Sequence, residues 1–449
     1  MIRAFEVRNY KSIVDMTLSL TYGEGKAPPR SERDETIPFL SCGRSSADRY
    51  APVLAVYGAN ASGKSTILAA FNTLQRLLEN GVFGLYVPNK LNRIYQTCRL
   101  AVDLSLGKWA CFYVVEYDGK GIVCEELYKR EKVENERCEG LVYRIKRSEA
   151  FDDRAMLSAE ITGVSTKDYP QERLMEAMRV ECSDAKGYMV RPFLWCLVRS
   201  FAGLLPLASD VWNEINGRVR VFGHNAFFVS QGVDLLAGND TDEARQEAMN
   251  KIVRLLQKFD FGIRDISVFR QQVQKPRPGI MGEISGQQFA PGAVFGDRGD
   301  RIIVDTITSK HLDTDGKFVP FNFMLEESDG TKLTAGLLGM GLWALEKGRT
   351  IVIDEIDRSI HPFILSAIVR LFKSPRYNKT NAQLVFTVHD PTLLENGQLR
   401  ISEVAIVSKT LRGGTTCHRL CDIKGVRNVH NFRKQYLDSA YAGIPFPYI

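Results

Sequence analysis

The chain has 449 residues, 44% of them hydrophobic and 25% charged, and its formal net charge at pH 7 is +6. This is the composition of an ordinary soluble globular protein, and the length predicts two or three structural units with a substantial core. No apolar run is long enough to cross a bilayer, and charged residues near the start argue against a secretory signal peptide.

The charge and the cysteines narrow the setting further. A net charge of +6 permits contact with DNA or RNA but does not establish it. The nine cysteines are odd in number and scattered, which favours the cytoplasm, where thiols stay reduced. Cys417, His418 and Cys421 form a small cluster, but without a second pair nearby a zinc site is disfavoured.

The first part of the chain predicts two strands, over residues 2–8 and 13–20, followed by a loop over 21–50. A short apolar run at 53–57 then leads into residues 58–66, which match G-x-x-x-x-G-K-[ST], the phosphate loop of nucleotide-binding proteins. A periodic apolar helix comes directly after it. This strand-before, helix-after context disfavours the alternative of a glycine-rich turn that carries Lys-Ser by chance.

The chemistry of this loop can be assigned by residue type. Gly58 and Gly63 let the backbone curl so that its N–H groups surround phosphate oxygens. Lys64 would reach the β- and γ-phosphates, the Ser65 hydroxyl would hold Mg²⁺, and the helix N-terminus favours the same anion. We therefore predict a site for ATP and Mg²⁺, formed by Gly58, Asn60, Ala61, Ser62, Gly63, Lys64, Ser65 and Thr66.

The middle of the chain changes character twice. Residues 98–106, 109–117 and 121–129 predict an antiparallel meander, whereas 170–217 and 241–258 are helical in pattern and 271–300 reads as a loop. Basic residues accompany the helices, and solvated helix faces are favoured over nucleic-acid contact as their explanation. The domains predicted from this are 1–145, an N-terminal ATPase lobe, 146–300, a mainly helical insertion, and 301–449, a C-terminal ATPase lobe.

The last third contains three further motifs. Residues 326–332 lead into an apolar helix over 333–346 that Ser328 or Asp329 can cap, which on its own indicates only a good helix start. The apolar run at 350–353 ends in Asp354 and Glu355, and burying adjacent acids at a strand end is costly unless a cation compensates. We expect Mg²⁺ on Asp354 and Glu355 as the group that polarises the attacking water. His389 ends another apolar run, where it can sense the γ-phosphate.

Together these motifs resemble the ABC-type ATPase heads of SMC and RecF-like proteins, and above all the bacterial "AAA family" ATP-binding proteins related to OLD nucleases, many of which act in anti-phage defence. The resemblance covers roughly 1–130 and 301–449. It implies an α/β fold, a mixed sheet around the phosphate loop with an antiparallel β subdomain and a mainly helical insertion. The residues that it adds to the nucleotide site are Lys11, Ser12, Ser328, Gly330 and Lys332.

The resemblance also assigns roles. Glu355, Lys64 and His389 become the catalytic residues, Ser65 and Asp354 the metal ligands, and residues 357–362 the D-loop. The signature, 328–332, departs from the usual Leu-Ser-Gly-Gly form, and Gln96 lies in the interval expected for a Q-loop glutamine without a diagnostic local sequence. In such heads the signature of one copy contacts the γ-phosphate bound by the other, so ATP joins a head-to-tail dimer.

Three functions follow as hypotheses. The first is an ATPase that senses nucleic acid, DNA or RNA, and controls a separate effector such as a nuclease in phage defence, since the chain shows no TOPRIM pattern of its own. The second is a RecF-like DNA-repair ATPase, and the third is a scaffold that binds ATP with little hydrolysis. A transporter ATPase is the weakest alternative, because no membrane partner surface is evident.

Overall fold

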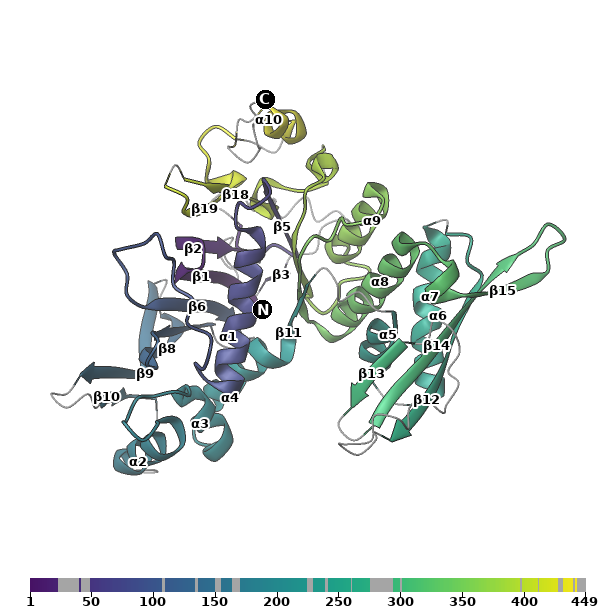
Figure 1. Cartoon of the computed structure of the whole chain (residues 1–449). Helices are drawn as coiled ribbons and strands as arrows, with labels where there is room; N and C mark the ends of the chain where they lie inside the picture. The colour runs from purple at the N-terminus through teal and green to yellow at the C-terminus, as the bar shows by residue number, and fades with distance from the viewer. Residues whose placement is uncertain are drawn as a thin grey trace. The chain divides into compact units, whose positions relative to one another are not determined.

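The computed structural model describes residues 1–22, 40–41, 49–106, 110–133, 136–149, 155–163, 170–223, 229–238, 241–259, 261–274, 294–298, 301–395, 398–410, 412–426, 431–438 and 441. The chain, traced in Figure 1, forms two compact units. The first contains Met1–Val221, Gly348–Glu355 and Arg370–Ile449, and the second contains Phe222–Lys347 and Ile356–Val369.

The first unit is built on a mixed sheet. Its strands are β1 (Ile2–Tyr10), β2 (Ile13–Ser19), β5 (Val53–Gly58), β6 (Cys98–Ser105), β7 (Ala110–Tyr117), β8 (Ile122–Val133), β9 (Glu136–Glu149), β10 (Ala155–Ile161), β11 (Val219–Phe222), β16 (Thr350–Ile353), β17 (Gln383–Thr387), β18 (Val404–Lys409) and β19 (Thr415–Arg419), and a separate small ladder pairs β3 (Leu40–Ser41) with β4 (Arg49–Tyr50). Its helices are α1 (Lys64–Asn80), α2 (Gln171–Cys182), α3 (Phe193–Ser200), α4 (Pro206–Trp212) and α10 (Phe432–Leu437), with a π-helical turn at Asn213–Arg218.

The strand order confirms the predicted fold class. Among the described residues the order is β10-β9-β8-β7-β6-β1-β2-β19-β18-β5-β17-β16-β11. The neighbours β18, β5, β17 and β16 are parallel, whereas β10 through β2 form an antiparallel ladder. The structure therefore has the predicted mixed sheet, with a parallel core around the phosphate loop and an antiparallel β subdomain. The predicted meander is confirmed as β6, β7 and β8.

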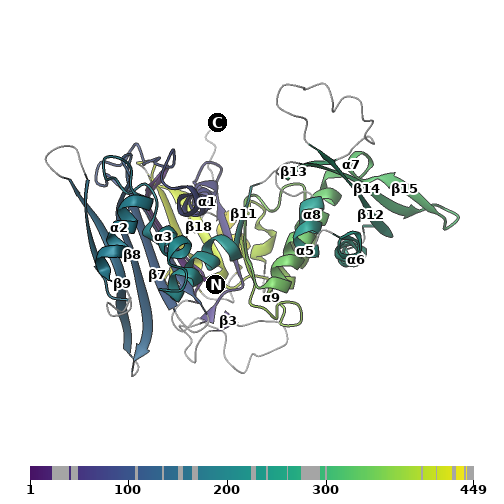
Figure 2. The same cartoon turned by 90° about the horizontal axis from the view of Figure 1, so that it is seen from below.

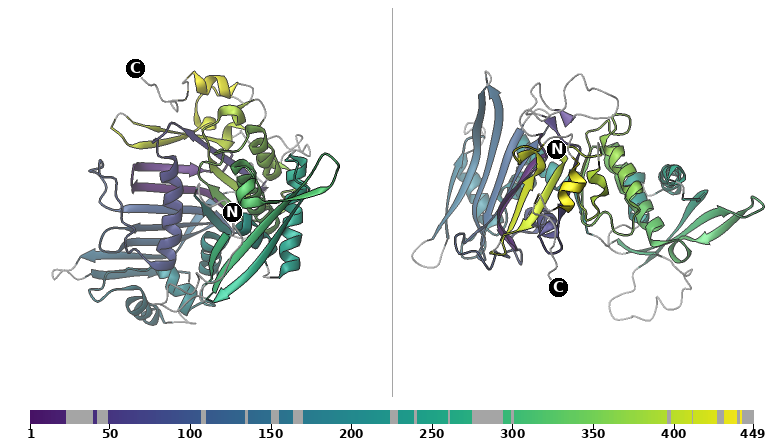
Figure 3. Two further views of the ribbon diagram at one scale, coloured as in Figure 1. Left: turned by 45° about the vertical axis from the view of Figure 1, so that its right-hand side comes forward. Right: turned by 90° about the horizontal axis from the view of Figure 1, so that it is seen from above.

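Helix α1 supplies the core on one face of this sheet. Its apolar positions recur with helical spacing, and Ile67, Leu68, Phe71 and Leu74 are all buried. Figure 3 shows α1 lying across the strands, and the Phe71 ring stacks on Phe5 of β1 with centroids 4.0 Å apart. Because α1 begins at the last residues of the phosphate loop, this packing fixes the loop to the sheet.

The unit boundaries differ from those expected at 145/146 and 300/301. Strand β9 runs through residue 145, and β10 with the three helices α2 to α4 remains part of the first unit beside the antiparallel strands (Figure 2). The expected loop at 271–300 is interrupted, because β12 continues to Gln274 and β13 covers Val294–Arg298, while 275–293 lie outside the described residues. The insertion that leaves the first unit therefore starts at Phe222 and ends at Lys347.

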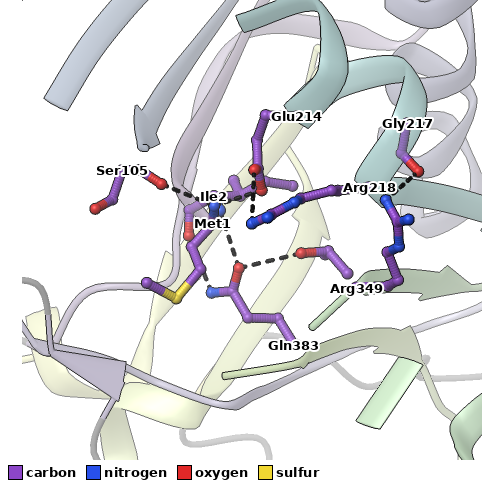
Figure 4. A network of polar contacts seen from close by, with 9 residues as sticks. Met1, Ile2, Ser105, Glu214, Gly217, Arg218, Arg349 and Gln383 are labelled. Atoms are coloured by element: carbon purple, nitrogen blue, oxygen red, sulfur yellow. Dashed lines mark hydrogen bonds and ion pairs between the residues drawn. The ribbon is translucent and has the colours of Figure 1, made fainter. Parts of the chain in front are cut away.

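A polar network marks the place where the chain leaves and re-enters the first unit (Figure 4). The side chain of Gln383 brackets the N-terminal strand, accepting from the Ile2 N–H at 2.9 Å and donating to the Ile2 carbonyl at 3.0 Å. Arg349, which directly precedes β16 where the chain returns, donates to the carbonyl of Gly217 at 2.7 Å. Glu214 pairs with the terminal amine of Met1. The outgoing and the returning segments are thus held together.

The second unit combines helices with a small antiparallel sheet. Its elements are α5 (Val229–Ala237), α6 (Asp242–Lys258), β12 (Asp265–Gln274), β13 (Val294–Arg298), β14 (Arg301–Leu312), β15 (Phe318–Asn322), α7 (Phe323–Glu326), α8 (Asp329–Lys347) and the first two turns of α9 (Pro362–Lys373). Helix α8 packs closely on α5, because a Cβ on Gly339 would lie 2.9 Å from the backbone of Gly232. Backbone contact at this crossing holds the helix that carries the signature residues.

Candidate nucleotide-binding site

Three of the predicted motifs follow the carboxyl ends of adjacent parallel strands. Strands β5, β17 and β16 are parallel neighbours, with Phe386 beside both Ala55 and Ile353. Their carboxyl ends lead into the phosphate loop, into His389 and into Asp354 with Glu355, respectively. Ligands of open α/β sheets bind outside the carboxyl ends of such strands.

The glycines of the loop are required by its shape. Gly58 has φ of 153° and Gly63 has φ of 112°, both in the region that other residues avoid. A Cβ on Gly58 would lie 2.3 Å from the Val407 carbonyl oxygen, and one on Gly63 would lie 2.4 Å from Thr415 Oγ1. Gly63 caps α1 with its backbone, and no described side chain caps that helix, so its first N–H groups suit an anion.

Two polar side chains of the loop are buried. Lys64 is 6% exposed, and its Nζ donates to the carbonyls of Gly58 at 2.7 Å and Ala59 at 3.0 Å, which places the ammonium inside the loop. The Ser62 hydroxyl is buried and has no hydrogen-bond partner among the described atoms. A buried cation and an unsatisfied hydroxyl in a curled loop fit the phosphates of a nucleotide.

Two residues that are distant from the phosphate loop in the sequence support it through hydrogen bonds. Thr415, at the start of β19, donates to the Ser62 carbonyl at 2.9 Å and contacts Ser12 Oγ at 2.9 Å. Ser12 Oγ in turn lies 3.5 Å from Thr66 Oγ1, and the Thr415 N–H donates to the Ser12 carbonyl. The structure therefore places Ser12 beside the phosphate loop and adds Thr415, which sequence reasoning missed.

The two acids at the end of β16 are organised by one hydroxyl. Thr387 Oγ1 donates to Asp354 Oδ1 at 2.6 Å and accepts from the Glu355 N–H, also at 2.6 Å. Glu355 has φ of 50°, a strained conformation for a residue with a side chain. Strain of this kind persists only where neighbours hold it in place and is common at functional sites.

His389 lies close to the proposed general base. Its Nε2 is 4.0 Å from Glu355 Oε1, and both side chains are 39% exposed, so solvent and a ligand can reach them.

Neighbouring aromatic residues fix the ends of β5 and β17 to each other. The Tyr57 hydroxyl donates to the Asp390 carbonyl at 3.2 Å, and the Tyr57 ring meets that of Tyr436 with centroids 5.5 Å apart.

Tyr436 connects the C-terminal helix α10 to the loop. Burial raises the pKa of its hydroxyl, and a hydrogen bond with the backbone of Gly58 acts in the opposite direction. The hydroxyl therefore stays neutral at physiological pH and adds no charge beside the phosphate loop.

The signature residues belong to the second unit. Ser328 caps α8, because its Oγ accepts from the Thr331 N–H at 3.1 Å, which decides between the two capping candidates. Gly330 packs on the D-loop, since a Cβ there would lie 2.7 Å from the Ser359 carbonyl oxygen. Lys332 Nζ lies 3.4 Å from Asp329 Oδ1. The signature and the D-loop are thus in direct backbone contact within the second unit.

The structure groups the predicted residues into two sets. Residues 58–66, Ser12, Asp354, Glu355 and His389 all belong to the first unit, and Ser328, Gly330 and Lys332 belong to the second. Asn60, Ala61 and Ser65 are exposed on the loop. Lys11 is exposed too, and its N–H donates to the Val87 carbonyl at 2.9 Å. Gln96 is exposed, and its carbonyl accepts from the Tyr86 hydroxyl.

The donor set fits Mg²⁺ bound with a nucleotide. Magnesium in such sites takes one or two protein oxygens and completes its shell with phosphates and water. Ser65 and Asp354 supply oxygens of this kind, and no group of three His, Cys, Asp or Glu among the described residues forms a cage for a metal.

None of the described helices combines the length and apolarity needed to span a bilayer.

We expect Thr387→Val to lower ATP turnover about 10- to 100-fold and to raise the Mg²⁺ concentration needed for half-maximal turnover, because the Asp354 carboxylate loses its hydrogen-bond donor. Thr387→Ser keeps the hydroxyl and should behave nearly like the unmodified chain. Steady-state phosphate release across a Mg²⁺ titration measures both effects. An unchanged Mg²⁺ midpoint in Thr387→Val would remove Thr387 from the site.

Comparison with known proteins gives a partial match. A family model described as "AAA domain, putative AbiEii toxin, Type IV TA system" matches residues 213–395, which include the signature, Asp354, Glu355 and His389 but not the phosphate loop. No curated protein matches the chain.

Two solved structures are similar in outline. The crystal structure of an SmcHead bound to the C-winged helix domain of ScpA has 11% identity, covers 93% of this chain and 97% of that chain, and has a TM-score of 0.42. The SMC head domain from Thermotoga maritima has 12% identity, covers 93% and 98%, and has a TM-score of 0.36. These values indicate only a coarse likeness.

Proposed function

We propose that this chain is an ATPase whose two copies close around ATP, and that its cycle regulates a separate effector, such as a nuclease, in defence against phage. The observation that carries the ATPase part is the meeting of three motifs at neighbouring strand ends. The phosphate loop, the Asp354–Glu355 pair and His389 end parallel strands that are hydrogen-bonded side by side. Their residue types are those that phosphoryl transfer to water requires.

Each residue has a role set by its place. Lys64 meets the charge of the β- and γ-phosphates from inside the loop. Ser65 and Asp354 would hold Mg²⁺, which when bound neutralises charge on the phosphates. Glu355 orients the attacking water and accepts its proton, and His389, 4.0 Å from Glu355, hydrogen-bonds the γ-phosphate and registers its loss. Lys11 and Ser12 contribute to the nucleotide site from the turn between β1 and β2.

The signature set completes the site in trans. Ser328 and the N-terminus of α8 form an anion-favouring helix start, and Gly330 and Lys332 lie within its first turn. In the proposal they belong to the second copy and meet the γ-phosphate opposite Lys64. Because Gly330 contacts Ser359 of the D-loop, losing the γ-phosphate would shift both together and release the dimer.

The regulatory part rests on what the chain carries besides the site. Its second unit is a compact body of helices and strands, formed by Phe222–Lys347 and Ile356–Val369, that is suited to relaying the nucleotide state to a partner. The family model that matches 213–395 is described as a putative toxin of a type IV toxin–antitoxin system, which agrees with a role in controlling cell fate. DNA or RNA is the proposed trigger.

The test is phage infection of cells that carry the chain with its neighbouring genes. We expect plaque formation to fall, and the protection to vanish with Lys64→Ala or with deletion of an adjacent effector gene. Protection by the chain alone would contradict a separate effector. Radiation sensitivity on deletion with no effect on phage would support the RecF-like alternative, and ATP binding without turnover would support the scaffold.

A further inference from the structure

The edge strand of the second unit exposes a run of apolar side chains. Among the described strands β15 pairs with β14 alone. At its start Phe318 is 64% exposed and Val319 is 37% exposed, and Pro320 next to them is also exposed. Three consecutive exposed apolar residues on an edge strand are unusual unless another surface covers them. Pro320 lacks an N–H, so side-chain packing is favoured there over the addition of another strand.

This edge is directly coupled to the signature. Strand β15 continues into α7 and Leu325, which is 60% exposed, three residues before Ser328. Glu327, the residue before Ser328, is held by two side chains of β14. Ser309 Oγ donates to Glu327 Oε1 at 2.6 Å, and His311 Nε2 lies 2.6 Å from the same oxygen. Whatever packs on the β15 edge therefore lies beside the signature serine.

The first unit has an exposed apolar surface of its own, on the loop 81–97 between α1 and β6. Phe83, Leu91 and Ile94 are 69%, 70% and 79% exposed. The loop is nevertheless fixed, because the buried Asn9 donates to the carbonyls of Tyr95 and Thr97, each at 3.0 Å. Asn9 Oδ1 also accepts from the N–H of residue 89 and from the side chain of residue 92. A preorganised loop loses little entropy on docking.

The loop 81–97 flanks the phosphate loop. Its Val87 carbonyl accepts from the N–H of Lys11, the residue before Ser12. Its Leu91 borders the β18–β19 turn, since a Cβ on Gly413 would lie 3.1 Å from Leu91 Cδ1. That turn leads into Thr415, which braces the phosphate loop. Each exposed apolar surface thus adjoins one half of the proposed shared site.

The two surfaces carry opposite charge. The loop 81–97 contains Lys90 and Arg93 and no carboxylate. Within residues 313–332, which include β15, carboxylates outnumber lysines: Asp313, Asp315, Glu326, Glu327 and Asp329 accompany Lys317 and Lys332. Complementary charge around an apolar centre is the pattern of a specific protein interface.

We propose that the β15 edge and Leu325 of one copy receive the loop 81–97 of a second copy, so that the contact closes the dimer around each nucleotide. The proposal rests on the proposed function, in which the signature of one copy meets the phosphate loop of the other. It adds the surfaces that give this dimer its affinity and register.

The test uses the full chain carrying Glu355→Gln, with ATP and Mg²⁺, and measures the dimer dissociation constant by sedimentation. Ile94→Ser and Phe318→Ser should each raise that constant about tenfold or more. Their matched controls are Val180→Ser, at a residue 75% exposed on α2, and Phe269→Ser, at a residue 64% exposed on β12 of the same small sheet. The controls should leave the constant unchanged, and all four variants should bind a fluorescent ATP analogue equally.

A charge swap tests the register. Arg93→Glu and Asp315→Lys should each weaken the dimer, and a chain carrying both should recover it, because both symmetric contacts are then restored with exchanged signs. A dimer indifferent to Ile94→Ser and Phe318→Ser would overturn the proposal and leave this edge to a different protein. A Glu355→Gln chain that binds ATP but never dimerises would instead overturn the shared site itself.

Discussion

Replacing Glu355 with glutamine is expected to stop ATP turnover and to let the ATP-bound dimer accumulate. The amide cannot accept a proton from the attacking water, and the loss of a general base lowers rates about 10²- to 10⁴-fold. The change spares the local structure, because Thr387 holds residue 355 through its backbone N–H. Steady-state phosphate release gives the rate, and sedimentation with ATP and Mg²⁺ gives the dimer.

The matched control for this change is Glu395→Gln. Glu395 is an exposed carboxylate that pairs with Arg433, and it follows the short helical turn after His389. Its replacement should alter neither turnover nor assembly. If Glu355→Gln also left both unchanged, Glu355 would not be the general base.

The second large effect is expected from Lys64→Ala and Ser328→Arg, which should each abolish hydrolysis for different reasons. The first removes the ammonium that the loop carbonyls of Gly58 and Ala59 hold in place. The second removes the cap of α8 and puts a bulky side chain where the γ-phosphate should enter. We expect Lys64→Ala to lose ATP binding and Ser328→Arg to keep it, since in the proposed dimer Ser328 acts on the partner's nucleotide.

Ser328→Thr serves as the control for the second substitution. Threonine retains the hydroxyl that caps α8, so turnover should remain within a few-fold of the unmodified chain. Equilibrium binding of a fluorescent ATP analogue and phosphate release together distinguish the two variants. If Ser328→Arg lost ATP binding, the signature would act on the nucleotide bound by its own chain and not on the partner's.

The sequence predicts the parts of this protein whose signals are local. The phosphate loop has a fixed spacing and an apolar stripe after it, and α1 begins where that spacing requires. The strand before Asp354 and Glu355 is fully buried, as its apolar sequence predicts. Placing two acids at the end of such a strand is costly unless a cation compensates their charge. The sequence also predicts the start of α8 with Ser328 or Asp329 as its cap, and the structure selects Ser328.

Contacts between distant segments explain what the sequence leaves out. Thr415 supports Ser62 from 353 residues away, and nothing near it in the sequence marks that role. Thr387 could have been noticed as a polar residue that closes an apolar strand just before His389, but its bond to Asp354 depends on strand order. The same holds for the unit boundaries, because the pairing of β10 with β9 and the exit at Phe222 are set by tertiary packing.

The central claim is that one nucleotide site is shared between two copies, and mixing the two inactive variants tests it most directly. In a dimer of Lys64→Ala with Ser328→Arg, one of the two sites combines an intact phosphate loop with an intact signature. Equal mixing with free exchange should therefore restore about a quarter of the unmodified turnover, since half of the dimers are mixed. Turnover that stays at zero in a mixture shown to contain the mixed dimer would contradict the shared site.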